Sequence, residues 1–227
     1  MIDTIAFDGD DTLWHNESLF SMTQERFRAL LAHAADPADI DRRLLAAERA
    51  NLRVYGYGIK GFVLSMIETA VDLTDGRIAG RDIQSLIDFG KAMLDHPVDL
   101  LDGVAEVVEA LSGRYRLLLI TKGDLFDQES KIARSGLVER FDAVEIVSEK
   151  DPDTYRRVLD RHGVAPGRFV MVGNSVRSDI LPVLAVGGHA VHVPYAITWA
   201  HEEAAPPTEN YRRIDTVRDL PPLLNAW

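Results

Sequence analysis

Two aspartates separated by one residue follow a short apolar segment near the N-terminus. Residues 4–7 (TIAF) include β-branched side chains and lead directly into Asp8-Gly9-Asp10, which predicts a buried strand. While the chain stays extended, the side chains of Asp8 and Asp10 leave the same face, about 6 to 7 Å apart. Two carboxylates so placed raise each other's pKa unless a cation lies between them. We therefore expect chemistry at the end of this strand, with a metal ion as the third member of the site.

Polar residues follow later apolar segments in the same way. Thr121 ends the run RLLLI, and residues 174–179 (NSVRSD) follow the run FVMVG. Lys150 stands just ahead of Pro152, which can begin a helix. Ligands of open parallel sheets gather at the carboxyl ends of the strands. Thr121 is therefore expected at the same edge as Asp8.

The stretch FDGDDTLW at residues 7–14 resembles the first motif of the haloacid dehalogenase (HAD) superfamily, an apolar strand followed by DxDx(T/V). The family's later motifs are a Ser or Thr after a second strand, a Lys at a helix start and an acidic pair after a fourth strand. Thr121, Lys150 and residues 174–179 occupy these places in order, so the resemblance spans nearly the full chain. It implies an α/β fold, with a Rossmann-like parallel sheet as the core and an inserted all-helical cap.

The resemblance also implies roles for the motif residues. Asp8 would attack phosphorus, and Asp10 would protonate the leaving oxygen and then activate water. Thr121 and Lys150 would complete the catalytic set by contacting the phosphoryl group. Mg2+ is the implied cofactor, and its expected ligands are Asp8, Asp10, Asn174 and Asp179.

Three positions depart from the family pattern. Lys122 stands where relatives usually have Asn, so it is either an additional phosphate contact or a surface residue. Asp151 separates Lys150 from Pro152, although the family commonly has Lys followed at once by Pro. Asn174 replaces the first acidic residue of the fourth motif, and its amide oxygen can still ligate a hard cation with one negative charge fewer.

The elements that must position these residues fall into two groups. After Trp14, four amphipathic helical patterns follow one another over about 80 residues without a credible strand, and Pro97 closes them. From Leu100 onward helices and strands alternate, which is typical of a parallel sheet covered by helices on both faces. We expect a core domain from residues 1–15 and 97–227 and a helical cap from residues 16–96.

A glycine-rich segment within the expected cap, residues 55–62 (YGYGIKGF), formally matches the dinucleotide-binding pattern GxGxxG. The context argues against that function, because the preceding residues 42–54 predict a helix rather than a buried strand. The segment is either a simple turn between helices or a loop that contacts substrate. In HAD proteins with a cap after the first motif, the resemblance implies that cap loops choose the substrate, so Tyr57 and Lys60 are candidate substrate-binding residues.

Composition excludes several classes of protein. The net charge of −11 over 227 residues argues against a nucleic-acid partner. Apolar runs are too short to cross a membrane, and no signal peptide or cysteine is present, which favours a cytoplasmic location. We expect a monomer or homodimer. His201, Glu202 and Glu203 lack the second His of a zinc-protease motif and are interpreted as solvated surface.

The motif set favours a Mg2+-dependent phosphatase that hydrolyses a small phosphorylated metabolite through an aspartyl-phosphate intermediate. A haloacid dehalogenase is an alternative, but in the family the true dehalogenases lack an aspartate at the position of Asp10. A phosphonatase would need a cap lysine able to form a Schiff base, and only Lys60 and Lys91 are available. A non-catalytic binding protein on the same fold is the alternative that Asn174 leaves open.

Overall fold

The computed structural model describes residues 1–207 and 211–225. Its contacts divide the chain into two compact units. The α/β unit comprises residues 1–17, 98–122 and the chain from 128 onward, and the helical unit comprises residues 18–97 with 123–127. The short second segment of the helical unit lies outside the cap boundaries expected from sequence.

The α/β unit is built on a parallel sheet whose strand order is β3-β2-β1-β4-β5-β6. The α/β fold with a parallel sheet agrees with the sequence prediction. Beyond it, the structure adds β6, which no sequence pattern indicated. The strands are β1 (Thr4–Phe7), β2 (Arg116–Lys122), β3 (Ala143–Val147), β4 (Phe169–Gly173), β5 (His189–His192) and β6 (Arg212–Arg213).

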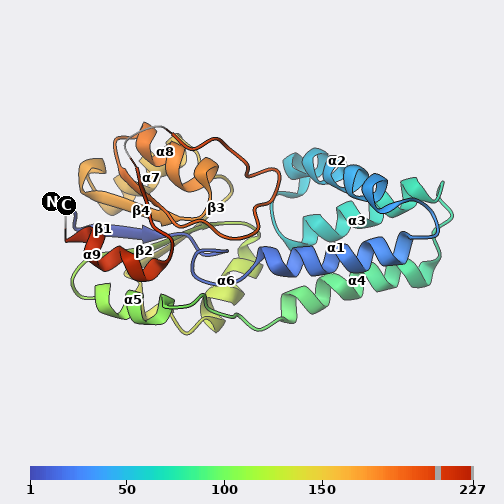
Figure 1. Ribbon diagram of the computed structural model, residues 1–227, viewed down its shortest axis with the longest axis horizontal. Helices are drawn as coiled ribbons and strands as arrows, with labels where there is room; N and C mark the ends of the chain where they lie inside the picture. Colours follow the sequence, from blue (N-terminus) through green and yellow to red (C-terminus); the bar gives the residue numbers. More distant parts are fainter. Residues whose placement is uncertain (208–210, 226–227) are drawn as a thin grey trace. The chain divides into compact units, whose positions relative to one another are not determined.

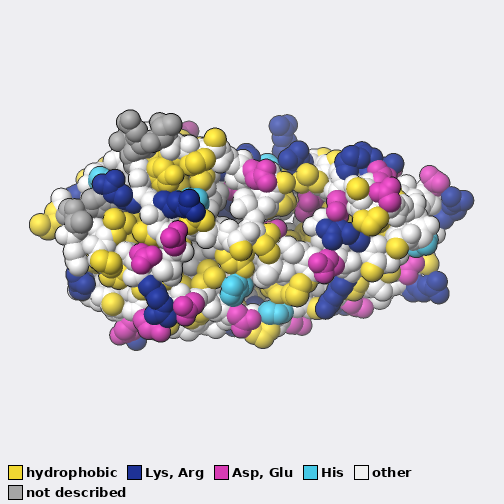
Figure 2. All heavy atoms as spheres, viewed as in Figure 1, with side chains coloured by type: hydrophobic (Ala, Val, Ile, Leu, Met, Phe, Trp, Pro, Cys, Tyr) yellow, Lys and Arg dark blue, Asp and Glu magenta, His cyan; other side chains and the backbone are white. Residues whose placement is uncertain are grey.

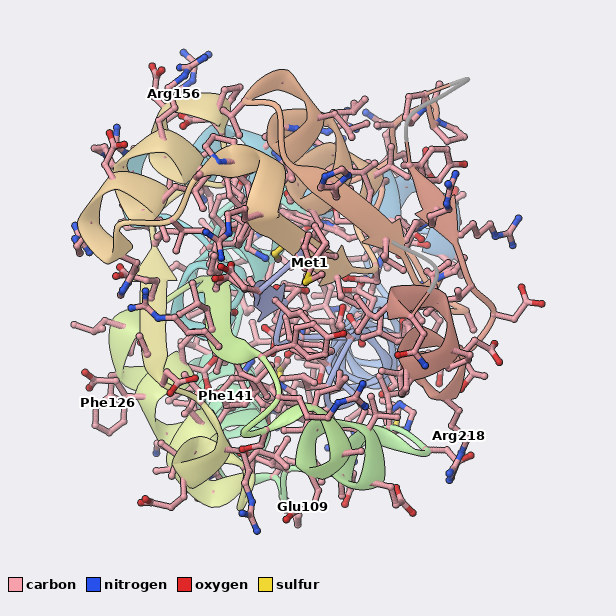
Figure 3. All side chains as sticks on the ribbon, turned by 90° about the vertical axis from the view of Figure 1, so that its left-hand side faces the viewer. Met1, Glu109, Phe126, Phe141, Arg156 and Arg218 are labelled. Carbon is pink, nitrogen blue, oxygen red and sulfur yellow. The ribbon has the colours of Figure 1, made fainter. Side chains whose placement is uncertain are left out.

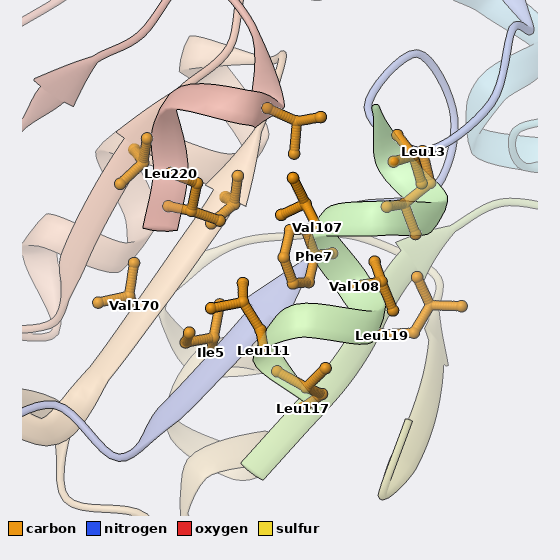
Figure 4. Close-up of a cluster of buried hydrophobic side chains, with 14 of the residues drawn as sticks. Ile5, Phe7, Leu13, Val107, Val108, Leu111, Leu117, Leu119, Val170 and Leu220 are labelled. Atoms are coloured by element: carbon orange, nitrogen blue, oxygen red, sulfur yellow. The ribbon is translucent and has the colours of Figure 1, made fainter. Parts of the chain in front are cut away.

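Helices cover both faces of this sheet (Figure 1). Alternate residues of the central strands enter two separate apolar clusters, because successive side chains of a strand point to opposite faces. Phe7, Leu117 and Val170 pack with α5 (Val104–Leu111) and α9 (Leu220–Leu224) on one face, as Figure 4 shows. Ala6, Leu118 and Met171 pack on the other with α7 (Pro152–His162) and α8 (Leu181–Ala185).

The strand register aligns the ends that carry the sequence motifs. Phe7 pairs with Leu119 of β2 and with Val172 of β4. Asp8, Thr121 and Gly173 therefore lie at one edge of the sheet, the edge formed by the carboxyl ends of the strands. The remaining elements of the unit are α6 (Leu125–Arg134), which begins among residues of the helical unit, η1 (Val138–Arg140), η2 (Pro166–Arg168), η3 (Val176–Ile180) and η4 (Val217–Asp219).

The helical unit is formed by α1 (Glu17–Leu31), α2 (Pro37–Tyr55), α3 (Ile59–Leu73) and α4 (Gly80–Asp95). Phe27, Leu44, Met66 and Leu86, one from each helix, belong to a single apolar core. The charged residues of these helices pair at the surface, as Arg28 does with Asp41. Figure 2 shows Lys and Arg interspersed with Asp and Glu over the visible face.

The glycine-rich segment is the turn between α2 and α3. Gly56 is the C-cap of α2 with φ of 72°, and Gly58 is the N-cap of α3 with φ of 112°. These left-handed conformations suit glycine, and Gly61 already lies in α3. Helix α2 directly precedes the segment, as the pattern of residues 42–54 predicted. Every helix within residues 1–207 and 211–225 is too short or too polar to cross a membrane.

Candidate active site

Strand β1 carries Asp8 to the edge of the sheet. The backbone N–H of Asp8 donates to the Val172 carbonyl at 2.9 Å, so pairing with β4 continues up to this residue. Gly9 follows at a point of close approach, where an added Cβ would lie 2.7 Å from Trp14 Cζ2 and 3.3 Å from Thr121 Oγ1. A side chain here would collide with the indole, so glycine is required by space.

Lys150 lies between two aspartates. Its Nζ donates to Asp8 Oδ1 at 2.5 Å and to Asp179 Oδ1 at 2.7 Å, and all three side chains are buried. The departure at Asp151 has a structural explanation, because Asp151 is the N-cap of α7 and its carboxylate accepts from the Thr154 N–H at 2.7 Å. The helix therefore begins at Pro152, two residues after Lys150.

Burial and the attraction between Lys150 and the two aspartates dominate the electrostatics of this group. Burial raises the pKa of Asp8 to about 7; Lys150 opposes the rise, and Asp179 and Asp10 add to it. Burial alone would lower the pKa of Lys150, but the carboxylates of Asp179 and Asp8 outweigh it and hold the pKa above its ordinary value. One ammonium thus faces two carboxylates, and the remaining negative charge favours a further cation.

A π-helical turn, η3, places Asp179 over Gly173. A Cβ on Gly173 would lie 2.2 Å from Asp179 Oδ2, and the Ser175 N–H donates to the same oxygen at 3.0 Å. Wide turns of this kind are frequent at functional sites. Since Lys150 binds the other oxygen, the Asp179 carboxylate is engaged on both sides.

The hydroxyl of Thr12 lies close to oxygens of two of the four expected metal ligands. Thr12 Oγ1 lies 3.4 Å from Asp8 Oδ2 and 3.3 Å from Asn174 Oδ1. Mg2+ keeps several waters and takes few protein oxygens, so Asp8 and Asn174 fit such an ion. The carboxylates of Asp10 and Asp179 are directed to other donors. Within the described ranges, no three His, Cys, Asp or Glu side chains converge as a metal cluster.

Asp10 is held by three side chains. Trp14 Nε1 donates to Oδ1 at 2.7 Å, Gln128 Nε2 donates to Oδ2 at 2.9 Å, and Lys131 Nζ lies 2.9 and 3.0 Å from the two oxygens. Thr121 Oγ1 donates to Gln128 Oε1 at 3.0 Å, so Gln128 connects Thr121 with Asp10. Sequence reasoning missed Trp14, Gln128 and Lys131.

Asp11, which the sequence analysis also passed over, closes the loop that follows Asp8. It adopts φ of 60°, and its carboxylate accepts from the backbone N–H groups of Asn16 at 2.9 Å and Glu17 at 3.0 Å. Burial raises the pKa of Asp11 to about 7. Asp11 thus fixes the route from β1 to the start of α1, a role for which a DxDD sequence gives no separate signal.

Lys122 is engaged by protein groups. Its Nζ donates to Ser178 Oγ at 2.9 Å and to Glu202, and lies 3.5 Å from Glu149 Oε1. The expectation that Glu202 is solvated surface is wrong, because Ser175 and Ser178 donate to its Oε2 at 2.5 and 2.6 Å. Burial would raise the pKa of Glu202, but Lys122 and the two hydroxyls lower it to about 2.

The two candidate substrate residues of the glycine turn belong to the helical unit. Tyr57 is partly buried in the turn itself. Lys60 Nζ donates to the Asp124 oxygens at 2.9 and 3.1 Å and lies 5.4 Å from the centre of the Phe126 ring. The ammonium of Lys60 is therefore already paired within its own unit.

The family described as haloacid dehalogenase-like hydrolase matches residues 2–187. The chain belongs to this family. As a HAD-like hydrolase it is an enzyme, and it has the family's parallel sheet.

Solved structures agree with the assignment. A haloacid dehalogenase-like family hydrolase from Xanthomonas campestris is 46% identical, with a TM-score of 0.90, and the match covers 99% of this HAD-like hydrolase and 91% of that chain. A 2-haloacid dehalogenase from Pseudomonas syringae pv. tomato has a TM-score of 0.67 over the full length of both chains at 21% identity. At that identity the likeness shows the fold alone.

Curated relatives are named as phosphatases. The N-acylneuraminate-9-phosphatase of Mus musculus is 30% identical over 142 residues, and the human protein of that name is 28% identical over 170. These matches cover 59% and 70% of this HAD-like hydrolase. The chain spans about half to two thirds of the length of these relatives, at 54% and 66%.

Proposed function

We propose that this HAD-like hydrolase is a Mg2+-dependent phosphatase that acts on a small phosphorylated metabolite through an aspartyl-phosphate on Asp8. The observation that carries the proposal is the second carboxylate, Asp10, held by three side chains two residues after the nucleophile. A leaving alkoxide needs a proton, and a fixed carboxyl group can supply one. The names of the curated relatives support the same reaction class.

The residues would act in two steps. Asp8 attacks phosphorus, and the bond to the leaving oxygen breaks as protonated Asp10 donates its proton to that oxygen. Asp10 then accepts a proton from the water that attacks the aspartyl-phosphate, which releases inorganic phosphate and restores Asp8. Lys150 and the Thr121 hydroxyl would stabilise charge on the phosphoryl oxygens throughout.

The implied Mg2+ would be held by Asp8 and Asn174, the two expected ligands whose oxygens meet at Thr12. When bound, it supplies positive charge against the phosphoryl oxygens. Asp10 and Asp179 would shape this site through their negative charge. Tyr57 and Lys60 would contact the part of the substrate beyond the phosphoryl group. Lys122 would reach a phosphate only if its ion pair with Glu202 broke.

The structure gives physical reasons against the phosphonatase alternative. A Schiff base requires a neutral lysine amine, whereas Lys60 is paired with Asp124 and Lys91 donates to Asp88 at 3.2 Å. Each of these lysines is thus engaged by a carboxylate of the helical unit. The dehalogenase alternative would leave Asp10 and its three partners without a chemical role.

The proposal is tested by a screen of phosphorylated metabolites with Mg2+ present or chelated. The first substrates should be N-acylneuraminate 9-phosphate, glyceraldehyde 3-phosphate and phosphoserine, because the relatives are named for them. Phosphate release that requires both Mg2+ and Asp8 is the expected result. Chloride release from 2-haloacids without metal would favour the dehalogenase instead, and no turnover of either class would favour a binding protein.

A further inference from the structure

The carboxylate of Asp10 has more partners than its expected chemistry needs. A general acid has to reach the leaving oxygen, yet Asp10 receives hydrogen bonds from an indole, an amide and an ammonium group. Together these donors engage both carboxylate oxygens and fix the plane of the group. The arrangement restricts Asp10 to one orientation.

Gln128 has a fixed orientation of its own. The NH2 group of Gln128 donates to Asp10 Oδ2, and its carbonyl oxygen accepts from the hydroxyl of Thr121. The side chain therefore holds two groups at once, one from the end of β1 and one from the end of β2. Any rotation of Gln128 would disturb both.

Two polar side chains of this arrangement, Gln128 and Lys131, are buried. Gln128 is 2% exposed and Lys131 is 8% exposed, and buried polar and charged groups are unfavourable unless they are paired. The two residues are three positions apart in α6 and share one helix face. Phe126 of the same helix is 67% exposed, and Figure 3 shows it directed away from the ribbon. The helix thus exposes an aromatic ring while it buries a lysine beside Asp10.

Lys131 also fixes the loop that leaves the site. Its Nζ donates to Asn16 Oδ1 at 2.9 Å, in addition to both oxygens of Asp10. Asn16 in turn donates its backbone N–H to Asp11. Lys131 therefore binds both ends of the segment from Asp10 to Asn16.

We propose that Gln128 and Lys131 are positioning residues for the phosphatase reaction, holding Asp10 toward the leaving oxygen and Thr121 in register with it. Neither touches the reacting atoms. The inference rests on the proposed function, since it assigns the pair a role through Asp10 and Thr121. It predicts that variants of Gln128 and Lys131 lose most kcat on substrates whose leaving oxygen must be protonated.

The kinetic test compares alkyl phosphates with 4-nitrophenyl phosphate, whose leaving group departs without help. We expect Lys131→Met and Gln128→Leu to lower kcat on alkyl phosphates by about 100-fold, the lower end of what general acid catalysis contributes, and on 4-nitrophenyl phosphate by less than about 10-fold. Lys131→Arg, which can still bind a carboxylate with two N–H groups, should recover most of the loss.

Lys91→Met and Gln84→Leu are matched controls, because these side chains pair with exposed Asp88 on α4. Equal losses on both substrate classes would overturn the proposal.

A second readout does not depend on turnover. The indole N–H of Trp14 donates to Asp10, so its NMR resonance reports the orientation of that carboxylate; Trp14→Phe assigns the signal. We expect the resonance to move in Lys131→Met and Gln128→Leu and to stay in Lys131→Arg and the two controls, each spectrum being recorded well below the thermal midpoint of that variant. An unmoved resonance in both α6 variants would contradict the proposal. If the wild-type enzyme hydrolyses no phosphate ester, the proposed function fails, and the indole signal still decides whether α6 positions Asp10.

Discussion

The two units of the molecule differ in where their ion pairs lie, buried at the sheet edge in one and at the surface in the other. In the α/β unit, Lys150 and Lys131 are buried against aspartates at the edge of the sheet. In the helical unit the core is apolar, and ion pairs such as Arg28 with Asp41 remain partly exposed to water. Exposed pairs contribute about 0 to 1 kcal/mol, whereas removing one partner of a buried pair costs about 3 to 5 kcal/mol. Loss of one charged partner should therefore cost more stability at the sheet edge of the first unit than on the surface of the second.

The largest effect should come from the nucleophile itself. Asp8→Asn is expected to lower phosphate release by at least about 10⁴-fold, because an amide cannot attack phosphorus, while Lys150 keeps Asp179 as a partner and the fold survives. Mass spectrometry of wild-type enzyme trapped during turnover should place the phosphoryl group on Asp8. A phosphoryl group on another residue, or an active variant, would show that the mechanism is wrong.

Removing the buried ammonium should cost the most stability. Lys150→Met leaves Asp8 and Asp179 facing each other without a cation, and we expect a loss of about 3 to 5 kcal/mol in the free energy of unfolding. Urea denaturation measures it. Lys91→Met in the helical unit removes an exposed partner of Asp88 and should barely move the midpoint. Similar losses in both variants would break the contrast between the units.

Two glycines test whether crowding matters differently in the two units. Gly173→Ala places a Cβ 2.2 Å from Asp179 Oδ2, and Gly90→Ala places one 2.3 Å from the Val63 Cγ2 methyl group. Each should cost about 1 to 3 kcal/mol of stability by overpacking. Only Gly173→Ala should also reduce kcat, because it displaces the partner of Lys150. Urea midpoints measure the loss of stability, and kcat measures the effect on the site. An equal loss of kcat in Gly90→Ala would contradict the prediction that only crowding at Gly173 reaches the site.

The last predicted effect on stability depends on pH. Ionisation of Glu202 stabilises the fold because its pKa in the folded protein, about 2, lies below its ordinary value of 4.5. This contribution is complete above pH 4.5 and is lost as pH falls toward 2. Glu202→Gln should therefore lower stability by about 2 kcal/mol at pH 7, and less below pH 4. Asp41→Asn, the exposed counterpart, should cost under about 1 kcal/mol at pH 7. A Glu202→Gln deficit that stays constant down to pH 3 would contradict the assignment.

The sequence predicted the parts of the fold that rest on hydrophobic pattern. Central parallel strands are buried on both faces, so β2 and β4 appear as unbroken apolar runs, and the helical unit shows apolar residues at helical spacing. By contrast β6 consists of Arg212 and Arg213, both exposed, and nothing in their composition indicates a strand. Its pairing with β5 follows from the sheet and not from its own residues.

The sequence predicted candidate site residues only where the residue type and its position relative to a strand or helix together match a family motif. Asp8, Thr121 and Lys150 follow strands or begin helices in a recognisable order. Charged residues within a helix usually face solvent, so nothing in the sequence of α6 distinguishes Lys131, which is buried, from its exposed neighbours. The prediction for Glu202 was wrong because its partners, Lys122 and Ser175, come from segments far away in the chain.

The place of β1 within the sheet has a consequence for how the enzyme loses activity. β1 is bonded on both sides, to β2 and β4, and all four of its residues are buried, whereas β6 is a two-residue edge strand. Amide protons of such an interior strand exchange with deuterium only when the whole cooperative unit opens, while an edge can open locally. The Asp8 amide, bonded to Val172, should belong to the slow class. Fraying at the edge strand should therefore leave Asp8 in place, and inactivation by heat should coincide with global unfolding.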